Sequence, residues 1–224
     1  MLVLKLPPRP DSLRDRFAAD GYLPLPGLVS AEGLRVLREE TARLEAAAVR
    51  RDFRMACMDD SPRHMTTLGG QQIAAQSTLI SGLYRNSALL AALSCVHGGD
   101  VLPVCDPVER HVLNILHRPG DTHGAHTDDH PFAVVLFIEA PPEPADGGLL
   151  EIHPGHADLA ALDHPGTRRL HHRAGDAYLL RSDRTAHRVT RLRRPGTRRT
   201  VLNFAYTTPG HQPLATGSAQ RLYE

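Results

Sequence analysis

The chain has 224 residues, 41% of them hydrophobic, and a formal net charge of +1. These values suit a globular protein and give no reason to expect nucleic acid or an anionic membrane as a partner. The three cysteines, Cys57, Cys95 and Cys105, lack metal-finger spacing and fit a reducing compartment. We therefore expect a cytoplasmic protein that acts on a small molecule, with no membrane span and with a homodimer as an open alternative to a monomer.

The first part of the chain, about residues 11–97, has mainly helical patterns. Ser30 is a suitable N-cap for a long amphipathic helix that runs to about residue 50. A second helical region covers about residues 78–96 and stops at a pair of glycines. Residues 51–75 between them have no clear period, so we interpret them as a long loop that either closes over a pocket as a lid or merely connects the helices.

The second part, about residues 101–208, reads as short strands separated by turns rich in glycine and proline. The expected strands cover residues 101–105, 111–117, 133–139, 149–153, 176–180, 188–192 and 200–206. Helices followed by many short strands favour a mainly β fold, a double-sheet jelly-roll core with an N-terminal helical buttress. No repeat or linker divides the chain, so we expect a single domain over 1–224.

A histidine-rich turn that leads into an apolar strand is the most informative stretch. His126 and Asp128 stand at i and i+2, so on an extended strand their side chains share one face. An imidazole and a carboxylate are two of the three ligands in the facial triad that binds Fe(II). With 14 histidines in the chain, about one such pair is expected by chance, and His156 with Asp158 is a second. The first is preferred because a glycine turn precedes it and a buried strand follows it.

The third metal ligand is expected from His187, which lies between two predicted strands. Further along, Arg198 and Thr200 again stand at i and i+2 of a strand. A guanidinium with a hydroxyl beside it suits the far carboxylate of a dicarboxylate ligand. These elements in this order are much less probable by accident than any one of them alone.

From Asp20 to Thr208 the chain resembles the Fe(II)/2-oxoglutarate-dependent oxygenases. Within them it is most similar to the small stand-alone hydroxylases of free amino acids, which are related to the amino-acid radical halogenases. The resemblance rests on the segments 117–129, 147–152, 175–176, 187–189 and 196–200. It implies a distorted double-stranded β-helix (jelly-roll, cupin-like) that binds Fe(II), 2-oxoglutarate and O2.

The resemblance also implies roles for individual residues. His126, Asp128 and His187 would be the catalytic metal ligands, and Arg198 with Thr200 would anchor 2-oxoglutarate. The implied reaction is hydroxylation of an unactivated C–H of a free, polar or basic L-amino acid or derivative, with decarboxylation of 2-oxoglutarate to succinate and CO2. The halogenases have a small residue where this chain has Asp128, which leaves a place for halide, so a hydroxylase is favoured.

His117 is a weaker candidate, because it stands where many members of the superfamily carry a tyrosine that touches 2-oxoglutarate. A histidine satisfied in the core explains it equally well.

Substrate contacts are expected from polar residues around the triad, namely His123, Asp129, Glu109, Asn203 and Arg63. Glu109 and Asp129 would pair with ammonium groups, and Arg63 would take a carboxylate. Asp129 could instead orient a metal-binding histidine, and Glu109 and Arg63 could be surface charges. The chain has no tryptophan, unlike the usual aromatic pocket of the subgroup, so the substrate's identity stays open.

Two other functions remain as alternatives. One is the same chemistry on another small metabolite, or desaturation or cyclisation in place of hydroxylation. The other is a non-catalytic jelly-roll module that binds a metal or ligand, which would have no need of a 2-oxoglutarate anchor.

Overall fold

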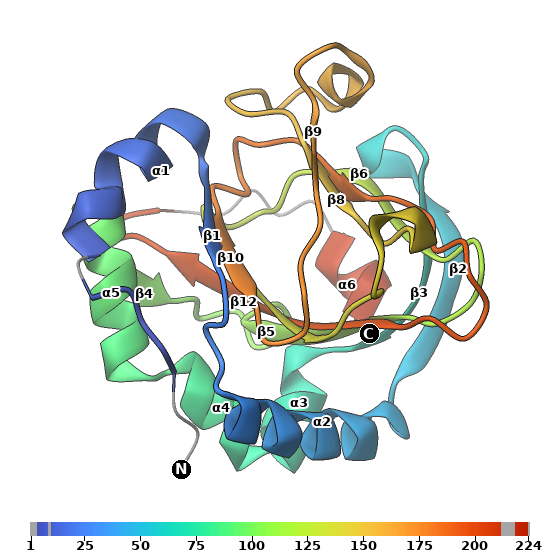
Figure 1. Ribbon diagram of the computed structural model, residues 1–224, viewed down its shortest axis with the longest axis horizontal. Coiled ribbons are helices and arrows are strands. Elements are labelled where there is room, and N and C mark those ends of the chain that lie inside the picture. The colour runs from blue at the N-terminus through green and yellow to red at the C-terminus, as the bar shows by residue number, and fades with distance from the viewer. Residues whose placement is uncertain (1–3, 9, 212–217, 224) are drawn as a thin grey trace.

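A computed structural model of the protein describes residues 4–8, 10–211 and 218–223. Within these residues, antiparallel strands form one strongly curled sheet that wraps around an interior (Figure 1). The strands are β1 Tyr22–Leu25, β2 Val49–Met55, β3 Ser61–Leu68, β4 Leu102–Pro103, β5 His111–Leu116, β6 Thr122–His126, β7 Phe132–Glu139, β8 Leu150–Ile152, β9 Arg168–Leu170, β10 Ala177–Leu180, β11 His187–Val189 and β12 Arg199–Thr207. Their order across the sheet is β1-β10-β7-β12-β5-β3-β6-β11-β8-β9, with β2 paired to β3 and β4 to β12.

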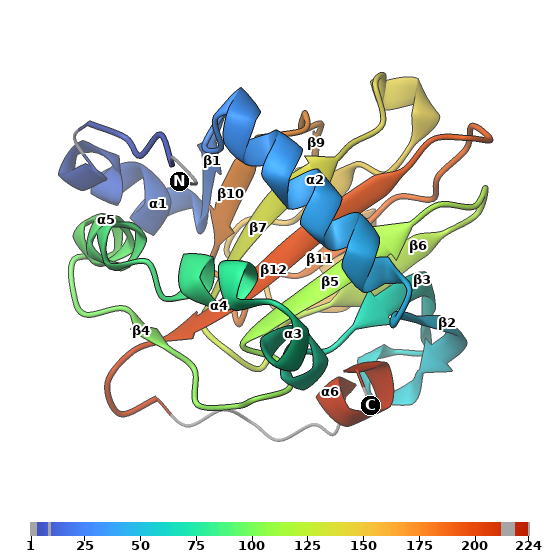
Figure 2. The same cartoon turned by 90° about the horizontal axis from the view of Figure 1, so that it is seen from below.

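Several of the helices, α2 and α4 among them, cover the outer face of this sheet. Figure 2 shows α2 and α4 lying across β7, β12 and β5. The helical segments are η1 Pro10–Leu13, α1 Arg14–Asp20, α2 Ala31–Glu45, η2 Ala56–Met58, α3 Gly70–Gln76, α4 Thr78–Tyr84, α5 Ser87–His97, η3 Pro144–Asp146, η4 Leu159–Asp163 and α6 Ser218–Tyr223. The Ser30 hydroxyl accepts a hydrogen bond from the Gly33 N–H at 3.1 Å, so Ser30 is the N-cap of α2 as its sequence predicts.

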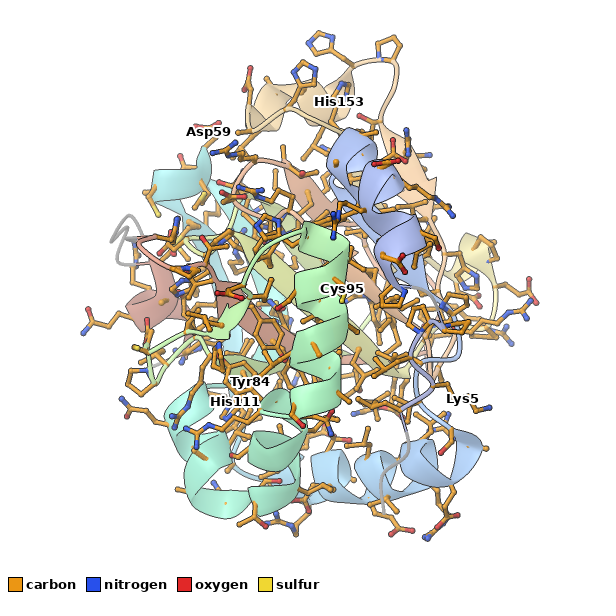
Figure 3. The ribbon with its side chains drawn as sticks, turned by 90° about the vertical axis from the view of Figure 1, so that its left-hand side faces the viewer. Lys5, Asp59, Tyr84, Cys95, His111 and His153 are labelled. Atoms are coloured by element: carbon orange, nitrogen blue, oxygen red, sulfur yellow. The ribbon has the colours of Figure 1, made fainter. Side chains whose placement is uncertain are left out.

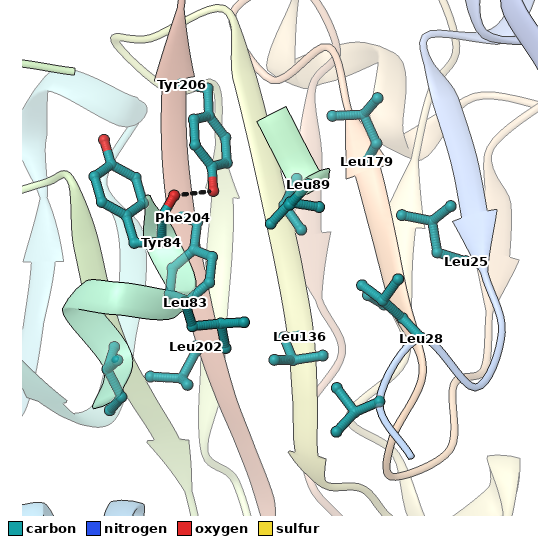
Figure 4. Packing of buried hydrophobic residues seen from close by; sticks show 14 of the residues in the cluster. Leu25, Leu28, Leu83, Tyr84, Leu89, Leu136, Leu179, Leu202, Phe204 and Tyr206 are labelled. Carbon is teal, nitrogen blue, oxygen red and sulfur yellow. Dashed lines mark hydrogen bonds between the residues drawn. The ribbon is translucent and has the colours of Figure 1, made fainter. Parts of the chain in front are cut away.

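The main core fills the space between the helices and the outer face of the sheet (Figure 4). Tyr84 of α4 stacks on Tyr206 of β12 with ring centroids 5.1 Å apart, and the Tyr206 hydroxyl donates to the Tyr84 carbonyl at 2.9 Å. His111 of β5 meets the same Tyr84 ring edge-on at 5.2 Å (Figure 3). Burial of each large apolar side chain here contributes about 1.5–3 kcal/mol, so these contacts fix the helices against the sheet.

Strand β12 separates this helical layer from the interior of the sheet. Its residues Leu202 and Phe204 pack in the main core, whereas Val201 and Asn203 face the interior. Arg199 has the same parity as Val201 and faces the interior too. Because successive side chains of a strand point to opposite faces, this parity decides which residues can reach an interior site.

The predicted jelly-roll fold with flanking helices is confirmed. The interpretation of residues 51–75 as a loop or lid is wrong, because β2 and β3 form a hairpin with seven paired positions from Val49 to Met55. Strand β3 then joins β5 and β6 within the sheet. The residues of β2 are exposed or half-exposed up to the buried Met55, so its sequence shows little of the apolar periodicity that predicts a strand.

One stretch, Thr78–His97, has the length and apolar composition of a membrane span. The chain divides it into α4 and α5, and the Asn86 side chain accepts from the Leu89 N–H at 2.9 Å to start the second helix. Leu83, Leu89 and Leu93 of this stretch belong to the main core. The packing therefore accounts for its apolar character.

Candidate metal and cofactor site

Two adjacent strands and the loop that follows one of them bring three potential metal ligands together. His126 ends β6 and pairs directly with His187, the first residue of β11. Asp128 lies in the loop after β6, where its N–H donates to the Ser182 carbonyl at 2.9 Å. The Asp128 Oδ1 is 3.7 Å from His126 Nε2 and 3.8 Å from His187 Nε2. The structure therefore brings together the three residues that the sequence analysis grouped, although Asp128 approaches the histidines from a loop and not from the face of a strand.

The two histidines are oriented as metal ligands. His126 Nδ1 lies 2.7 Å from the Gly124 carbonyl, and His187 Nδ1 lies 2.9 Å from the Thr185 carbonyl. A carbonyl only accepts, so each Nδ1 carries the hydrogen and each Nε2 lone pair is left to face Asp128. Burial holds the pKa of His126 well below its ordinary value, which keeps the imidazole neutral. Two imidazoles and a carboxylate whose ligand atoms lie within 4.8 Å of one another fit Fe(II).

A register shift in the pairing of β6 with β11 turns a third histidine inward. His126 pairs with His187, but the next pair joins His123 to Val189. The chain therefore advances three residues along β6 and only two along β11 between these pairs. The rings of His123 and His126 stack with centroids 4.0 Å apart and an interplanar angle of 14°. Burial lowers the pKa of His123, and its Nε2 has no hydrogen-bond partner in the described chain. A neutral ring with a free nitrogen therefore stands beside the triad.

A small cavity of about 40 Å³ adjoins the triad. All five predicted substrate residues line it, although they come from separate parts of the chain. The lining consists of Met55, Met58, Arg63, Glu109, His123, His126, Thr127, Asp128, Asp129, Asn203, Ser218, Ala219, Leu222 and Tyr223. Nε of Arg63, Nε2 of His123 and Oδ1 of Asn203 are buried without partners in the described residues. Buried polar atoms are rarely left unpaired, so their convergence on one cavity indicates a polar ligand.

The lining of the cavity includes a buried cation. The Arg63 guanidinium donates to the Ser61 hydroxyl at 2.7 Å and to nearby carbonyls, but it takes part in none of the ion pairs within the described residues. Burial lowers the pKa of Arg63 to about 10. An uncompensated buried charge is costly, so this position favours an anionic group of a ligand.

Carboxylates line the same cavity. Glu109 Oε2 lies 3.4 Å from His130 Nε2, and Asp129 lines the same cavity. Burial raises the pKa of Glu109, although the hydrogen bond from His130 opposes this shift. Burial by itself would lower the pKa of His130, but the Glu109 carboxylate raises it overall. The cavity therefore contains carboxylates as well as the Arg63 guanidinium, which suits a ligand with both signs of charge.

The C-terminal helix α6 contributes cavity residues that the sequence did not reveal. Leu222 and Tyr223 line the cavity, and the Thr67 hydroxyl donates to the Leu222 carbonyl at 2.9 Å. Burial raises the pKa of the Tyr223 hydroxyl, which accepts a hydrogen bond from the Asn114 side chain. A helix of six residues is too short to show helical periodicity, so no sequence pattern announces this contribution.

The prediction that Arg198 and Thr200 anchor 2-oxoglutarate is wrong. Arg198 pairs with Glu45 at 2.7 Å and with Glu139 at 3.0 Å, and the Thr200 hydroxyl donates to the same Glu139. These residues line a separate hollow between α2 and the outer face of β12. Their parity on β12 points them away from the triad.

Arg199 occupies the interior position instead. Its guanidinium lies over the Phe137 ring at 4.9 Å and shares a hydrogen bond with Tyr178. Arg199 is only 3% exposed, its Nε has no partner, and it is in no ion pair of the described chain. Burial lowers the pKa of Arg199. A buried guanidinium that lacks a carboxylate fits the far end of a dicarboxylate ligand.

His117 does not reach the site. Its peptide N–H donates to Asp121 at 2.9 Å, and its nearest charges include Arg118 and Arg198. Burial is the main cause that lowers the pKa of His117. It follows Leu116, which faces the interior, and so it points outward with Arg198. The expectation that it touches 2-oxoglutarate is therefore wrong.

A family model described as Halogenase D matches residues 8–222. The chain belongs to the Halogenase D family. A comparison of this Halogenase D family member with curated protein sequences gives no match.

Solved structures share the fold of this Halogenase D family member at low sequence identity. The epimerase SnoN in complex with Fe3+, alpha ketoglutarate and nogalamycin RO is 18% identical with a TM-score of 0.70, over 95% of this chain and 88% of SnoN. HygX from Streptomyces hygroscopicus with nickel and 2-oxoglutarate bound is 14% identical with a TM-score of 0.64, over 90% of this chain and 88% of HygX. A Pseudomonas putida prolyl-4-hydroxylase is 16% identical with a TM-score of 0.62, over 90% of this chain and all of its own (100%). The predicted fold and the predicted iron and 2-oxoglutarate cofactors agree with these structures.

Proposed function

We propose that this protein is an Fe(II)/2-oxoglutarate-dependent hydroxylase of a free, polar or basic L-amino acid or a close derivative. The observation that carries the proposal is the presence of both signs of charge in the cavity beside the triad. Arg63 is buried there without a counter-ion among the described residues, and Glu109 and Asp129 line the same cavity. An amino acid offers a carboxylate and at least one ammonium group to match them.

His126, Asp128 and His187 would hold Fe(II), and Arg199 would bind the far carboxylate of 2-oxoglutarate. When bound, the metal and 2-oxoglutarate supply an O2-dependent two-electron oxidation and yield succinate and CO2. Arg63 would take the substrate carboxylate and Glu109 its amine, so the chain fixes which C–H faces the metal. Leu222 and Tyr223 cover the cavity and would keep water from the reacting atoms.

Asp128 favours hydroxylation over halogenation. The family takes its description from a halogenase, and in the related radical halogenases a small residue leaves a metal position for halide. Here the Asp128 carboxylate occupies that position, 3.7 and 3.8 Å from the two histidines. Desaturation, cyclisation and oxidation of another small metabolite use the same metal and co-substrate and remain second candidates. SnoN, an epimerase, shows that this fold carries other outcomes.

The test is a screen of free amino acids for substrate-triggered succinate release, with mass spectrometry of the products. The proposal predicts that an amino acid with a polar or basic side chain stimulates succinate release and gains one oxygen atom, in chloride buffer as in its absence. Glu109→Gln should abolish the response to that substrate without preventing 2-oxoglutarate binding. A chlorinated product, or stimulation only by molecules that lack an amino group, would contradict the proposal.

A further inference from the structure

One buried serine holds the loop that carries Asp128. This loop covers residues 127–131 and lies between β6 and β7, outside both strands. Ser182, just after β10, is fully buried (0% exposed). Its carbonyl accepts from the Asp128 N–H at 2.9 Å, and its N–H donates to the Pro131 carbonyl at 3.1 Å. Its hydroxyl donates to the His130 carbonyl at 3.1 Å, so three hydrogen bonds connect this one residue to the loop.

The same loop carries the side chain that contacts Glu109. His130 is 5% exposed, and its Nε2 lies 3.4 Å from Glu109 Oε2. Glu109 lines the cavity, and Asp128 Oδ1 lies 3.7 and 3.8 Å from the Nε2 atoms of the two metal-binding histidines. A continuous series of contacts therefore runs from Glu109 through the His130 ring, the His130 carbonyl and Ser182 to the Asp128 peptide.

We propose that Ser182 is a positioning residue, which couples the Glu109 carboxylate in the cavity to the metal ligand Asp128. This inference rests on the proposed function, in which Glu109 takes an amine of the substrate. The 3.4 Å contact between Glu109 and His130 is longer than the typical charge-assisted hydrogen bond of about 2.7–2.9 Å, so a cation that binds Glu109 shifts the His130 ring at small cost. Because buried groups are closely packed, this shift passes to the His130 carbonyl and through Ser182 to Asp128. A cation in the cavity thus changes how Asp128 meets the metal.

The test is a double-mutant cycle on metal affinity, measured by calorimetric titration of Co(II) into metal-free protein. Glu109→Gln alters the cavity end of the series, and Ser182→Ala removes the bond to His130 but keeps both backbone bonds of Ser182. Loss of the Glu109 charge also acts on the metal directly, but that effect is the same in both backgrounds and cancels in the cycle. The factor by which Glu109→Gln changes the Co(II) affinity should differ roughly threefold or more between the wild-type and Ser182→Ala backgrounds. The visible spectrum of bound Co(II), which reports its ligand geometry, should respond to Glu109→Gln more in wild type than in Ser182→Ala.

Thr122→Val is the matched control. The buried Thr122 hydroxyl also donates to a carbonyl beside the triad, that of Val189 at 2.6 Å, but it lies outside the loop. The effects of Thr122→Val and Glu109→Gln on Co(II) affinity should therefore be additive.

Additive effects of Ser182→Ala and Glu109→Gln would overturn the proposal, and so would equal non-additivity in the Thr122→Val control. Ser182→Cys keeps the size of the side chain and donates only weakly, so it supplies the same cycle if Ser182→Ala does not fold. The cycle contains no substrate, so a failure of this coupling is distinguishable from a failure of the amino-acid screen that tests the proposed function.

Discussion

The parity of strand β12 makes a sharp prediction about two neighbouring arginines. Arg199 is buried over Phe137 with no carboxylate partner among the described residues, whereas Arg198 is paired on the outer face of the sheet with Glu45 and Glu139. Replacement of Arg199 by methionine removes the guanidinium and keeps an apolar chain over Phe137 in the interior of the sheet. We expect a large loss of 2-oxoglutarate affinity from this change. The same replacement at Arg198 should leave affinity unchanged.

The magnitudes follow from the surroundings of each residue. Two hydrogen bonds to a charged group contribute about 1.5–3 kcal/mol each, so loss of the Arg199 fork should cost about 3–6 kcal/mol of binding. At about 1.4 kcal/mol per tenfold, affinity should fall by roughly two to four orders of magnitude. Without ligand, Arg199→Met should be neutral or stabilising by up to about 2 kcal/mol, because a buried unpaired charge is removed. Arg198→Met breaks partly exposed ion pairs and should cost only about 0–1 kcal/mol.

Two assays separate the effects. Calorimetric titration of 2-oxoglutarate into anaerobic Fe(II)-loaded protein gives the affinities, and urea unfolding of the metal-free variants gives the stabilities. The reasoning is refuted if Arg198→Met weakens 2-oxoglutarate binding as much as Arg199→Met does. A strongly destabilised Arg199→Met protein would also contradict it, since that outcome would mean that the guanidinium already has a stabilising partner.

The remaining predictions concern charge and closure. Burial raises the pKa of Glu109 above that of the same carboxyl group in the unfolded chain, so the folded protein loses stability as the pH rises and Glu109 ionises. Glu109→Gln should therefore raise the free energy of unfolding more at pH 8 than at pH 5. The same variant should lose the stimulation of succinate release by the substrate. The Asp121 carboxylate accepts hydrogen bonds from the Arg50 guanidinium at 2.7 and 2.9 Å. Burial would raise the pKa of Asp121, but its hydrogen bonds lower it overall. The stability that the ionised Asp121 contributes is therefore present above the pKa of the unfolded chain and is lost as the pH falls through the pKa of the folded protein. Asp121→Asn should lower the free energy of unfolding, measured with urea, by about 2–3 kcal/mol at pH 7 and by less at acid pH. An equal loss at the two pH values would contradict the ion pair with Arg50. Tyr223→Ala opens the cavity, so the ratio of succinate to hydroxylated product should rise, and an unchanged ratio would show that α6 does not exclude water.

Much of the fold follows from local signals in the sequence. The N-cap at Ser30 and the apolar runs of β5 and β7 predict their elements because each signal lies within a few neighbouring residues. The hairpin β2–β3 does not, because its stability comes from pairing with the rest of the sheet. The helix α6 is too short for any periodicity, and only its packing over the cavity gives it a role.

The site shows the same division. His126, Asp128 and His187 are recognisable because their chemical types and order are unusual, even though the loop at Asp128 could not be foreseen. Strand parity in the sequence can distinguish Arg198 from Arg199 as the arginine that shares a strand face with the predicted substrate residue Asn203. Asn203 and Arg198 cannot share a face of one regular strand, whereas Asn203 and Arg199 can.

The most direct test of this account is anaerobic addition of Fe(II) and then 2-oxoglutarate to the purified protein, followed by visible absorption. The account predicts a weak metal-to-ligand charge-transfer band that requires both additions, because His126, Asp128 and His187 leave positions for the 2-oxo acid. The band should be absent in His187→Ala and, at moderate 2-oxoglutarate concentration, in Arg199→Met, but present in Arg198→Met. A folded, iron-loaded wild-type protein that shows no band would contradict the assignment of this cavity as an iron and 2-oxoglutarate site.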